Sequence, residues 1–323
     1  MAGILIIGDA TSGAATPAFL ELATAGTALA QTSGEPLNGA LIGNDATRIS
    51  SSLAGAVASL YLVEGSHYRP YTAQPYIAAA QAVIAASSAS VVLFAHTLET
   101  REWVPQLAAR LNAGLVMDCI SLGIEGDALV VTKPVYGGGV WGEFVIHGAP
   151  RMATIRSGIF EPAIAAKGGK VVRLDVPPPP PGAVTLIDES AAAASGGLKL
   201  KDAKIIVAGG RGLGGADNWH FIEDTAAALG AAVGCSRPIA DSGWVPSAYQ
   251  VGLSGTSVKP DVYIAVGISG AVQHLAGISA ARTVVAINTD ADADIFTRAN
   301  YGVVGDYREV LPAFIERIKQ LKS

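Results

Sequence analysis

Basic runs, clustered cysteines and long apolar stretches are all missing from this chain of 323 residues. Its 22 lysines and arginines are outnumbered by 27 aspartates and glutamates. No segment concentrates positive charge as a nucleic-acid footprint would. Gly, Ser and polar residues interrupt the apolar stretches well before they reach the length of a membrane span. We therefore expect no nucleic-acid partner and no membrane-embedded segment.

Cysteine is scarce, and the two that occur, Cys119 and Cys235, form neither a CxxC pair nor a metal-ligand spacing. Two free thiols are typical of a reducing compartment. No basic presequence and no secretory signal precedes the first apolar run. These features predict a cytoplasmic protein.

The common catalytic signatures are missing as well. The chain has no G-x-x-x-x-G-K-[ST] phosphate loop, no H-E-x-x-H metal motif and no G-x-S-x-G nucleophile elbow. The sequence thus predicts neither a nucleophile nor a metal site.

What the sequence does contain is typical of an α/β protein: half of its residues are apolar and 15% are charged. Short runs rich in Val and Ile alternate with alanine-rich stretches, which predicts mostly parallel sheets flanked by helices. In the first part we expect strands at 4–7, 39–42, 59–63, 91–95, 129–133 and 151–156, and helices at 16–30, 49–58, 76–86 and 104–111. In the second part we expect strands at 204–208, 231–234, 261–266, 283–288 and 302–305, and helices at 219–229, 271–276 and 310–321.

A run of five prolines, Pro177–Pro181, separates the two parts. Proline fixes φ and lacks an N–H, so the run favours an extended, semi-rigid linker, with an ordered loop as the alternative. We predict an N-terminal α/β domain over 1–190, with a structural or subunit-interface role. The second α/β domain is expected over 198–323, with 198–201 leading into its first strand.

The first strand of the second domain ends in a glycine-rich turn. Gly210, Gly212 and Gly215 satisfy G-x-G-x-x-G, a pattern that brings the backbone close to a diphosphate. The next strand ends in Ser236-Arg237, where the NAD fingerprint has an acidic residue. Arg237 is suited to the 2′-phosphate of NADP, to another anion or to an electron-rich ring, and a surface salt bridge is the plain alternative.

A second glycine turn, Gly267–Gly270, follows the third strand, and His274 falls in the first turn of the next helix. Two such turns in one sheet predict a single dinucleotide site at the carboxyl ends of the strands. A glycine-rich loop, Gln250–Thr256, lies between the two turns in the sequence. Its hydroxyls either donate to a ligand or cap the loop's own backbone.

The segment Tyr263–Gly277 resembles the signature segment of the alpha subunits of electron-transfer flavoproteins. The resemblance covers essentially all of the second domain. It continues through 285–290, 295–296 and 301–306, appears upstream at 209–212, 232–237 and 250–252, and extends more weakly to 107–111 and 133–138.

The resemblance implies a Rossmann-like C-terminal domain that binds FAD. By family likeness Ser269 to His274 hold the diphosphate, Ser236 and Arg237 approach the flavin with Arg237 against its ring, and His274 binds the pyrimidine edge. Asn288 and Asp306 serve the adenosine half. The implied site comprises Arg211, Ser236, Arg237, Val251, Gly252, Leu253, Ser254, Ser269, Gly270, Ala271, Val272, Gln273, His274, Asn288 and Asp306.

The family also implies an electron carrier rather than a substrate-transforming enzyme. Its partners would be a beta subunit in a heterodimer, dehydrogenases such as the acyl-CoA dehydrogenases of fatty acid oxidation, and a membrane quinone oxidoreductase. The family commonly has Gln-Thr-Gly-Lys where this chain has Leu253-Ser254-Gly255-Thr256, so the hydroxyl expected near flavin N5 is kept while an amide and a lysine are lost. Three alternatives stay open: electron bifurcation with NADH and a second FAD, an NADP-dependent oxidoreductase, and a regulatory nucleotide-binding subunit.

Overall fold

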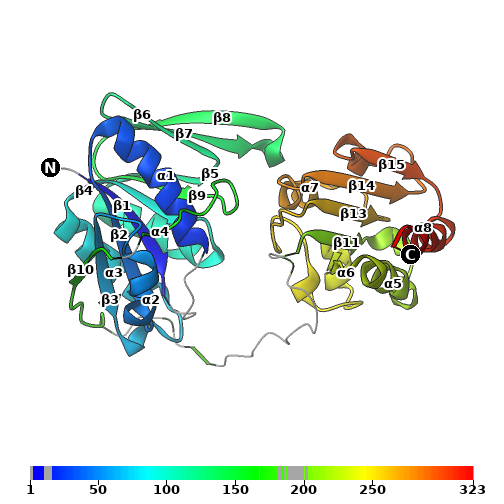
Figure 1. Cartoon of the computed structure of the whole chain (residues 1–323), viewed down its shortest axis with the longest axis horizontal. Coiled ribbons are helices and arrows are strands. Elements are labelled where there is room, and N and C mark those ends of the chain that lie inside the picture. The colour runs from blue at the N-terminus through cyan, green and yellow to red at the C-terminus, as the bar shows by residue number, and fades with distance from the viewer. Residues whose placement is uncertain are drawn as a thin grey trace. The chain divides into compact units, whose positions relative to one another are not determined.

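The structure, a computed structural model, describes residues 3–10, 17–166, 168–180, 184, 186–187, 200 and 203–322. The chain divides into two compact units (Figure 1). The N-terminal unit comprises Met1–Val135 with Gly139–Glu189, and the C-terminal unit comprises Tyr136–Gly138 with Ser190–Ser323. Pro177–Pro180 has no regular secondary structure. Pro181, the boundary region 188–199 and most of the expected lead-in at 198–201 lie outside the described residues.

A seven-stranded sheet forms the centre of the N-terminal unit, in the order β10-β3-β2-β1-β4-β9-β5, and all of its neighbouring strands are parallel. The prediction of a parallel sheet is confirmed, although β5 and β10 were not expected. The strands are β1 Gly3–Asp9, β2 Leu37–Gly43, β3 Ser59–Glu64, β4 Ala89–Ala95, β5 Gly114–Cys119, β9 Arg151–Ile155 and β10 Lys170–Arg173.

Helices cover both faces of this sheet (Figure 1). Along β1, Ile4 and Ile6 pack toward helices α1 (Pro17–Ser33) and α2 (Ala46–Leu53). Leu5 and Ile7 pack toward the opposite face, where α3 (Ala73–Ser87) and α4 (Leu98–Leu111) lie. Successive residues of a strand point to opposite faces, so a strand buried on both sides is apolar throughout.

Helix α2 is shorter than the sequence predicts. The expected helix continued to Ala58, but α2 ends at Leu53. A Cβ atom at Gly55 would overlap the carbonyl of Ala166, because that later segment pairs with Gly55 in an isolated bridge. This tertiary contact, absent from any local pattern, ends the helix.

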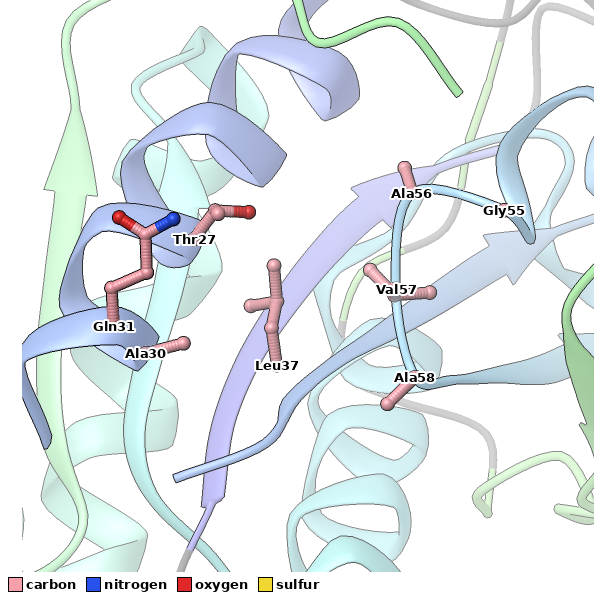
Figure 2. A pocket seen from close by; sticks show the side chains of 8 residues that line it. All are labelled: Thr27, Ala30, Gln31, Leu37, Gly55, Ala56, Val57 and Ala58. Atoms are coloured by element: carbon pink, nitrogen blue, oxygen red, sulfur yellow. The ribbon is translucent and has the colours of Figure 1, made fainter. Parts of the chain in front are cut away.

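Gly55–Ala58 forms one wall of a shallow hollow of about 400 Å³ at the amino ends of β2 and β3. Figure 2 shows Thr27 and Gln31 of α1 on the opposite wall, with Leu37 between the two walls. No charged side chain lines the hollow among the described residues. Ligands of parallel sheets gather at the carboxyl ends of the strands, so this hollow lies at the wrong edge for a site.

A smaller antiparallel sheet completes the N-terminal unit, with β7 (Ala128–Val135) between β6 (Ser121–Glu125) and β8 (Val140–Ile146). Only the central strand was expected. Within the described chain β8 pairs with β7 alone, and its Trp141 side chain is 72% exposed. Apolar residues point outward on both sides of β8, which removes the inward-apolar alternation by which a strand is recognised.

The C-terminal unit contains a five-stranded parallel sheet in the order β12-β11-β13-β14-β15. Helices α5, α6 and α8 pack on one face and α7 on the other. The predicted strands and helices are all found here, and the short α6 was not expected. The elements are β11 Ile205–Gly209, α5 His220–Leu229, β12 Ala232–Cys235, α6 Arg237–Asp241, β13 Val262–Val266, α7 Val272–Gly277, β14 Thr283–Asn288, β15 Tyr301–Val304 and α8 Tyr307–Lys322.

Three general features of the described residues bear on function. Cys119 and Cys235 are both free, as expected, and both are buried. In the described part of the chain, none of the helices is both long and apolar enough to cross a bilayer. The same residues bring together no group of three or more His, Cys, Asp or Glu side chains that would hold a metal ion.

One half-buried ion pair joins β5 to the segment after β9, at one edge of the N-terminal sheet. Asp118, at the irregular end of β5, adopts the left-handed region with φ of 67°. Arg156, which follows β9, donates to both of its carboxylate oxygens at 2.9 and 2.8 Å. Burial raises the pKa of Asp118, but the hydrogen bonds and charge of Arg156 outweigh burial, and the net pKa is lowered.

We expect Arg156→Ala to lower the free energy of unfolding by about 1.5–3 kcal/mol, because it removes charge-assisted hydrogen bonds from a half-buried carboxylate. The measurement is urea unfolding of the full chain followed by circular dichroism. Arg48→Ala is the matched control: Arg48 is largely exposed and pairs with Asp45 at 3.4 Å, so its loss should change stability by less than about 0.5 kcal/mol.

The pH dependence has a definite sign. A carboxyl whose pKa is depressed on folding stabilises the fold above its unfolded pKa and loses that contribution as the pH falls through the folded pKa. The difference between the wild type and Arg156→Ala should therefore persist down to the ordinary value of 3.8 and shrink below it. Equal stabilities at pH 7 would show that the pair does not stabilise the sheet.

Candidate functional site

The C-terminal sheet reverses its winding beside its first strand. From β11 the chain crosses to β12 on one side, and β13 then pairs with β11 on the other. Open α/β sheets with this strand order bind ligands in the crevice beyond the carboxyl ends of the two strands that flank the reversal. The turns after β11 and β13 are therefore the first place to look for a site, and they are the two glycine turns of the sequence.

The first glycine turn is fixed to the second by backbone contacts. The amide of Gly210 donates to the carbonyl of Val266 at 2.8 Å, and that of Gly212 donates to Gly267 at 2.9 Å. A Cβ atom at Gly210 would overlap the Gly267 carbonyl. Helix α5, which a dinucleotide fingerprint places directly after the glycines, begins only at His220. Gly210 and Gly212 thus serve close packing of two turns, and these two amides are already engaged.

The second turn is held by its carbonyls and leaves amides available. The carbonyl of Ile268 accepts from the Asn288 side chain at 3.0 Å, and that of Ser269 accepts from the Ile295 amide at 3.0 Å. Within the described chain, no acceptor takes a hydrogen bond from the amides of 269–273. Consecutive amides at the start of a helix bind phosphate groups, so this turn has the donors that a diphosphate needs.

The loop 250–256 is hydrogen-bonded both to the end of β12 and to α7. The amide of Val251 donates to Cys235 at 2.9 Å, and the amide of Leu253 donates to Gln273 at 2.8 Å. The side chain of Gln250, which the sequence did not single out, donates to the Ser254 hydroxyl at 2.9 Å. Through these bonds the loop lies at the same edge of the sheet as Ser236 and His274.

His274 is buried, with 6% of its surface exposed. Its Nε2 lies 3.0 Å from the hydroxyl of Tyr263, and no described residue makes a hydrogen bond to its Nδ1. Burial lowers the pKa of His274 to about 4, an effect that the carbonyl of Val251 opposes. Burial raises the pKa of Tyr263, so this phenol stays protonated, and its hydroxyl can either donate to Nε2 or accept from it. The imidazole is neutral at pH 7 and carries a single ring proton.

Sequence reasoning missed Tyr263, which orients that ring. The only signal was a single tyrosine inside an otherwise aliphatic strand.

Two exposed arginines follow the ends of β11 and β12. Arg237 begins α6, its side chain is 66% exposed, and it pairs with Asp241 at 3.1 Å. Arg211 is exposed, and no described residue pairs with it. Ser236, which precedes Arg237, is buried. Both cations are placed to meet an anionic or electron-rich ligand at this edge.

Asn288 and Asp306 lie farther along the sheet, after β14 and β15. Asn288 braces the second glycine turn and also accepts from the amide of Asp290 at 3.1 Å. Asp306 accepts from the backbone and side chain of Arg308, which lowers the pKa of its carboxyl. Their expected roles toward adenosine remain predictions.

Comparison with known proteins identifies the family. A family model described as the electron transfer flavoprotein FAD-binding domain matches residues 199–279, and one described as the electron transfer flavoprotein domain matches residues 4–179. The electron transfer flavoprotein subunit alpha of Thermoanaerobacterium thermosaccharolyticum is 38% identical over 91% of both chains, and that of Bacillus subtilis is 37% identical over 98% of both. The protein FixB of Clostridium saccharobutylicum is 33% identical over 99% of this chain and 97% of its own.

The chain belongs to the electron-transfer flavoprotein alpha subunits. The resemblance noted in the sequence is thus confirmed. A solved thiamin diphosphate-dependent enzyme from Mycobacterium smegmatis aligns at 13% identity with a TM-score of 0.23, over 93% of this chain and 53% of its own, which carries no argument.

The cofactor of this alpha subunit is FAD, and the C-terminal unit carries the family's FAD-binding domain. Its residues fit that cofactor: the amides of 269–273 suit a diphosphate, while the neutral His274 offers a buried ring nitrogen, Nδ1, that makes no hydrogen bond to the described residues. Arg211 and Arg237 supply positive charge at the same edge. The family match ends at residue 279, so Asn288 and Asp306 lie beyond it.

Gly210→Ala should sharply reduce FAD binding, because the added methyl group pushes the second turn away from its position. We expect at least about a tenfold loss of FAD affinity, because the amides of 269–273 that would bind the diphosphate are displaced. Flavin absorbance per chain after reconstitution measures it. Gly215→Ala is the matched control, since a Cβ atom there meets nothing within 4 Å. Equal flavin content in the two variants would contradict the packing argument.

Proposed function

We propose that this alpha subunit carries electrons in the cytoplasm as half of a heterodimer. It would receive them from dehydrogenases, such as the acyl-CoA dehydrogenases of fatty acid oxidation, and pass them to a membrane quinone oxidoreductase. The observation that supports this best is the similarity over nearly the whole chain to proteins named electron transfer flavoprotein subunit alpha, at 37–38% identity over 91–98% of both chains. The neutral His274, whose pKa burial lowers to about 4, is compatible with this role because it is a poor proton acceptor at pH 7.

FAD supplies the chemistry, since its ring accepts and releases electrons. The protein supplies the surroundings. Arg237 is permanently charged, and a guanidinium lies against a ring with a smaller desolvation penalty than an ammonium does. His274 adds a neutral imidazole whose Nδ1 makes no hydrogen bond to the described residues, and Ser254 adds a hydroxyl. Leu253, half exposed, stands where the family commonly has an amide, so this chain offers fewer polar groups near the flavin than its relatives.

The beta subunit of the heterodimer would contact the N-terminal domain, which we assign to 1–190. Support comes from β8, an edge strand with several exposed apolar side chains. An exposed apolar edge strand promotes association with another chain, and aromatic residues are enriched at interface centres. The exposed residues are Val140, Trp141, Phe144 and Val145.

The NADP-dependent alternative has less support. It depended on the first glycine turn together with Arg237, yet the amides of Gly210 and Gly212 are bound to Val266 and Gly267, and Arg237 pairs with Asp241. The bifurcating alternative requires a second FAD. Counting the flavins in the reconstituted heterodimer tests this alternative directly. One FAD per heterodimer supports the simple carrier, and two FAD molecules would support electron bifurcation instead.

Arg237→Ala should lower the first-electron reduction potential of the bound flavin. Loss of a charge-assisted interaction of about 1.5–3 kcal/mol corresponds to roughly 65–130 mV for one electron. His274→Ala should lower the potential by less, because a neutral donor stabilises added negative charge less than a cation does. Spectroelectrochemical titration of the heterodimer measures both. Arg317→Ala, on the exposed side of α8, is the control. If neither variant differs from the control, both residues only position the cofactor.

Replacing Trp141 and Phe144 by serine should weaken the heterodimer at least tenfold, as expected when two aromatic anchors leave an interface. Sedimentation velocity of mixed alpha and beta subunits at micromolar concentration measures the association. Glu143→Ser changes an exposed residue of the same strand and should leave the heterodimer intact. A double variant that associates as tightly as the wild type would place the interface elsewhere.

A further inference from the structure

The N-terminal domain has a crevice of its own where its sheet reverses winding. β1 lies between β2 and β4, so the chain crosses in opposite directions from this strand (Figure 1). A cavity of about 140 Å³ lies there, at the carboxyl ends of β1 and β4. Gly8 and Asp9 of β1 form part of it, with Phe19 of α1 and Trp103 of α4 on opposite faces. This is the position at which α/β sheets bind ligands.

Aromatic rings form much of the wall. Tyr76 of α3 lies 5.4 Å from the ring of Tyr71 and 6.0 Å from that of Trp103, centroid to centroid. Tyr76 and Trp103 are buried, so packing holds their rings in place. Aromatic faces carry partial negative charge and attract cations that approach within about 6 Å.

The charged side chains that line the cavity are negative. Asp9 and Glu99 line it, and the lining contains no Lys, Arg or His among the described residues. The Tyr76 hydroxyl donates to Asp9 at 3.1 Å, and the Tyr71 hydroxyl donates to Glu102 at 3.0 Å. Burial raises the pKa of Tyr71, and the charges of Glu102, Glu99 and Asp9 raise it further. Three carboxylates therefore act on one phenol in the cavity wall.

An anion is poorly matched to this cavity. The adjacent helix terminus belongs to α4, where Thr97 and Thr100 form a reciprocal capping box with N–H···O distances of 3.2 and 2.8 Å. Two amides at this helix start, those of Thr97 and Thr100, are thus already satisfied by the helix itself. Glu99 in the first turn adds negative charge at the same place.

We propose that this cavity binds a small organic cation, an ammonium group carrying a few carbon atoms. The aromatic walls and the carboxylates of Asp9 and Glu99 select the positive charge. The volume is below the roughly 300–1,000 Å³ of ordinary ligand pockets, which limits the ligand to a few heavy atoms. The site goes beyond the proposed electron-carrier function, because its described lining lies wholly in the N-terminal unit.

Equilibrium dialysis of labelled choline against the FAD-loaded heterodimer tests the proposal. Choline has a quaternary ammonium group, and 3,3-dimethyl-1-butanol has the same shape without the charge. We expect saturable binding of one choline per heterodimer, and at least tenfold weaker competition by the alcohol, as cation–π contacts in a partly dry site imply. No saturable binding, or equal competition by the alcohol, would overturn the proposal.

Substitutions in the alpha subunit locate the binding to this cavity. Asp9→Asn and Tyr71→Leu should each weaken choline binding on the order of tenfold, whereas Tyr71→Phe keeps the aromatic face and should retain most of it. Asp127→Asn makes the same chemical change in the exposed β6–β7 turn and should have no effect. Glu99→Gln replaces Asp9→Asn if the latter does not fold. Choline binding that survives Tyr71→Leu and the chosen carboxylate variant unchanged would exclude this cavity.

Discussion

The contact between the two glycine turns of the C-terminal domain determines what the rest of that domain can bind. Gly210 and Gly212 lie so close to the backbone of Gly267 that a Cβ atom at either position would overlap it. The contact joins the ends of β11 and β13, the two strands that flank the reversal of winding. Because of this contact, the two turns use their backbone amides differently. The first turn uses its amides on its neighbour, and the second keeps the amides of 269–273 for the cofactor.

The side chain beside those amides, His274, is positioned by a residue in the core of the domain. Tyr263 belongs to β13 and is completely buried, on the face of the sheet where α7 packs. Its hydroxyl lies 3.0 Å from Nε2 of His274 in α7 and holds the ring in place. Charging a buried phenol or a buried imidazole costs free energy, so burial keeps both groups neutral. Core packing and the properties of the FAD site are therefore one arrangement.

Much of this could be predicted from the sequence, for a physical reason. The strands of a parallel sheet covered on both faces are short, continuous apolar runs, and β11, β13 and β14 are of that kind. The glycine turns were equally visible. Long-range contacts could not be predicted in this way. Helix α2 ends at Leu53 because the later segment at Ala166 packs against Gly55, and no local sequence pattern indicates that contact. Helix α6 begins with Arg237-Pro238 and is too short for an apolar period to appear.

Among the candidate site residues, the sequence predicted polar or charged side chains that follow the ends of strands, such as Arg237 and His274, and their roles remain predictions. It missed Tyr263 and Gln250, which act through a second side chain. A tyrosine in a strand is usually a packing residue, and only its distance to His274 shows otherwise. Residues that position another residue carry no spacing signal, because their partner lies on a different element.

The two units have the same winding but opposite electrostatics. In each, the candidate site lies at the carboxyl ends of the strands where the order reverses, since that is where loops diverge and leave backbone groups uncovered. In the C-terminal unit these strand ends carry two arginines and the amides of 269–273, which no described residue accepts from, and these groups suit the diphosphate and ring of FAD. In the N-terminal unit the helix start is capped and the side chains are Asp9, Glu99 and aromatic rings. The winding of an α/β sheet thus fixes where a ligand binds, and the residues of a few turns decide the sign of its charge.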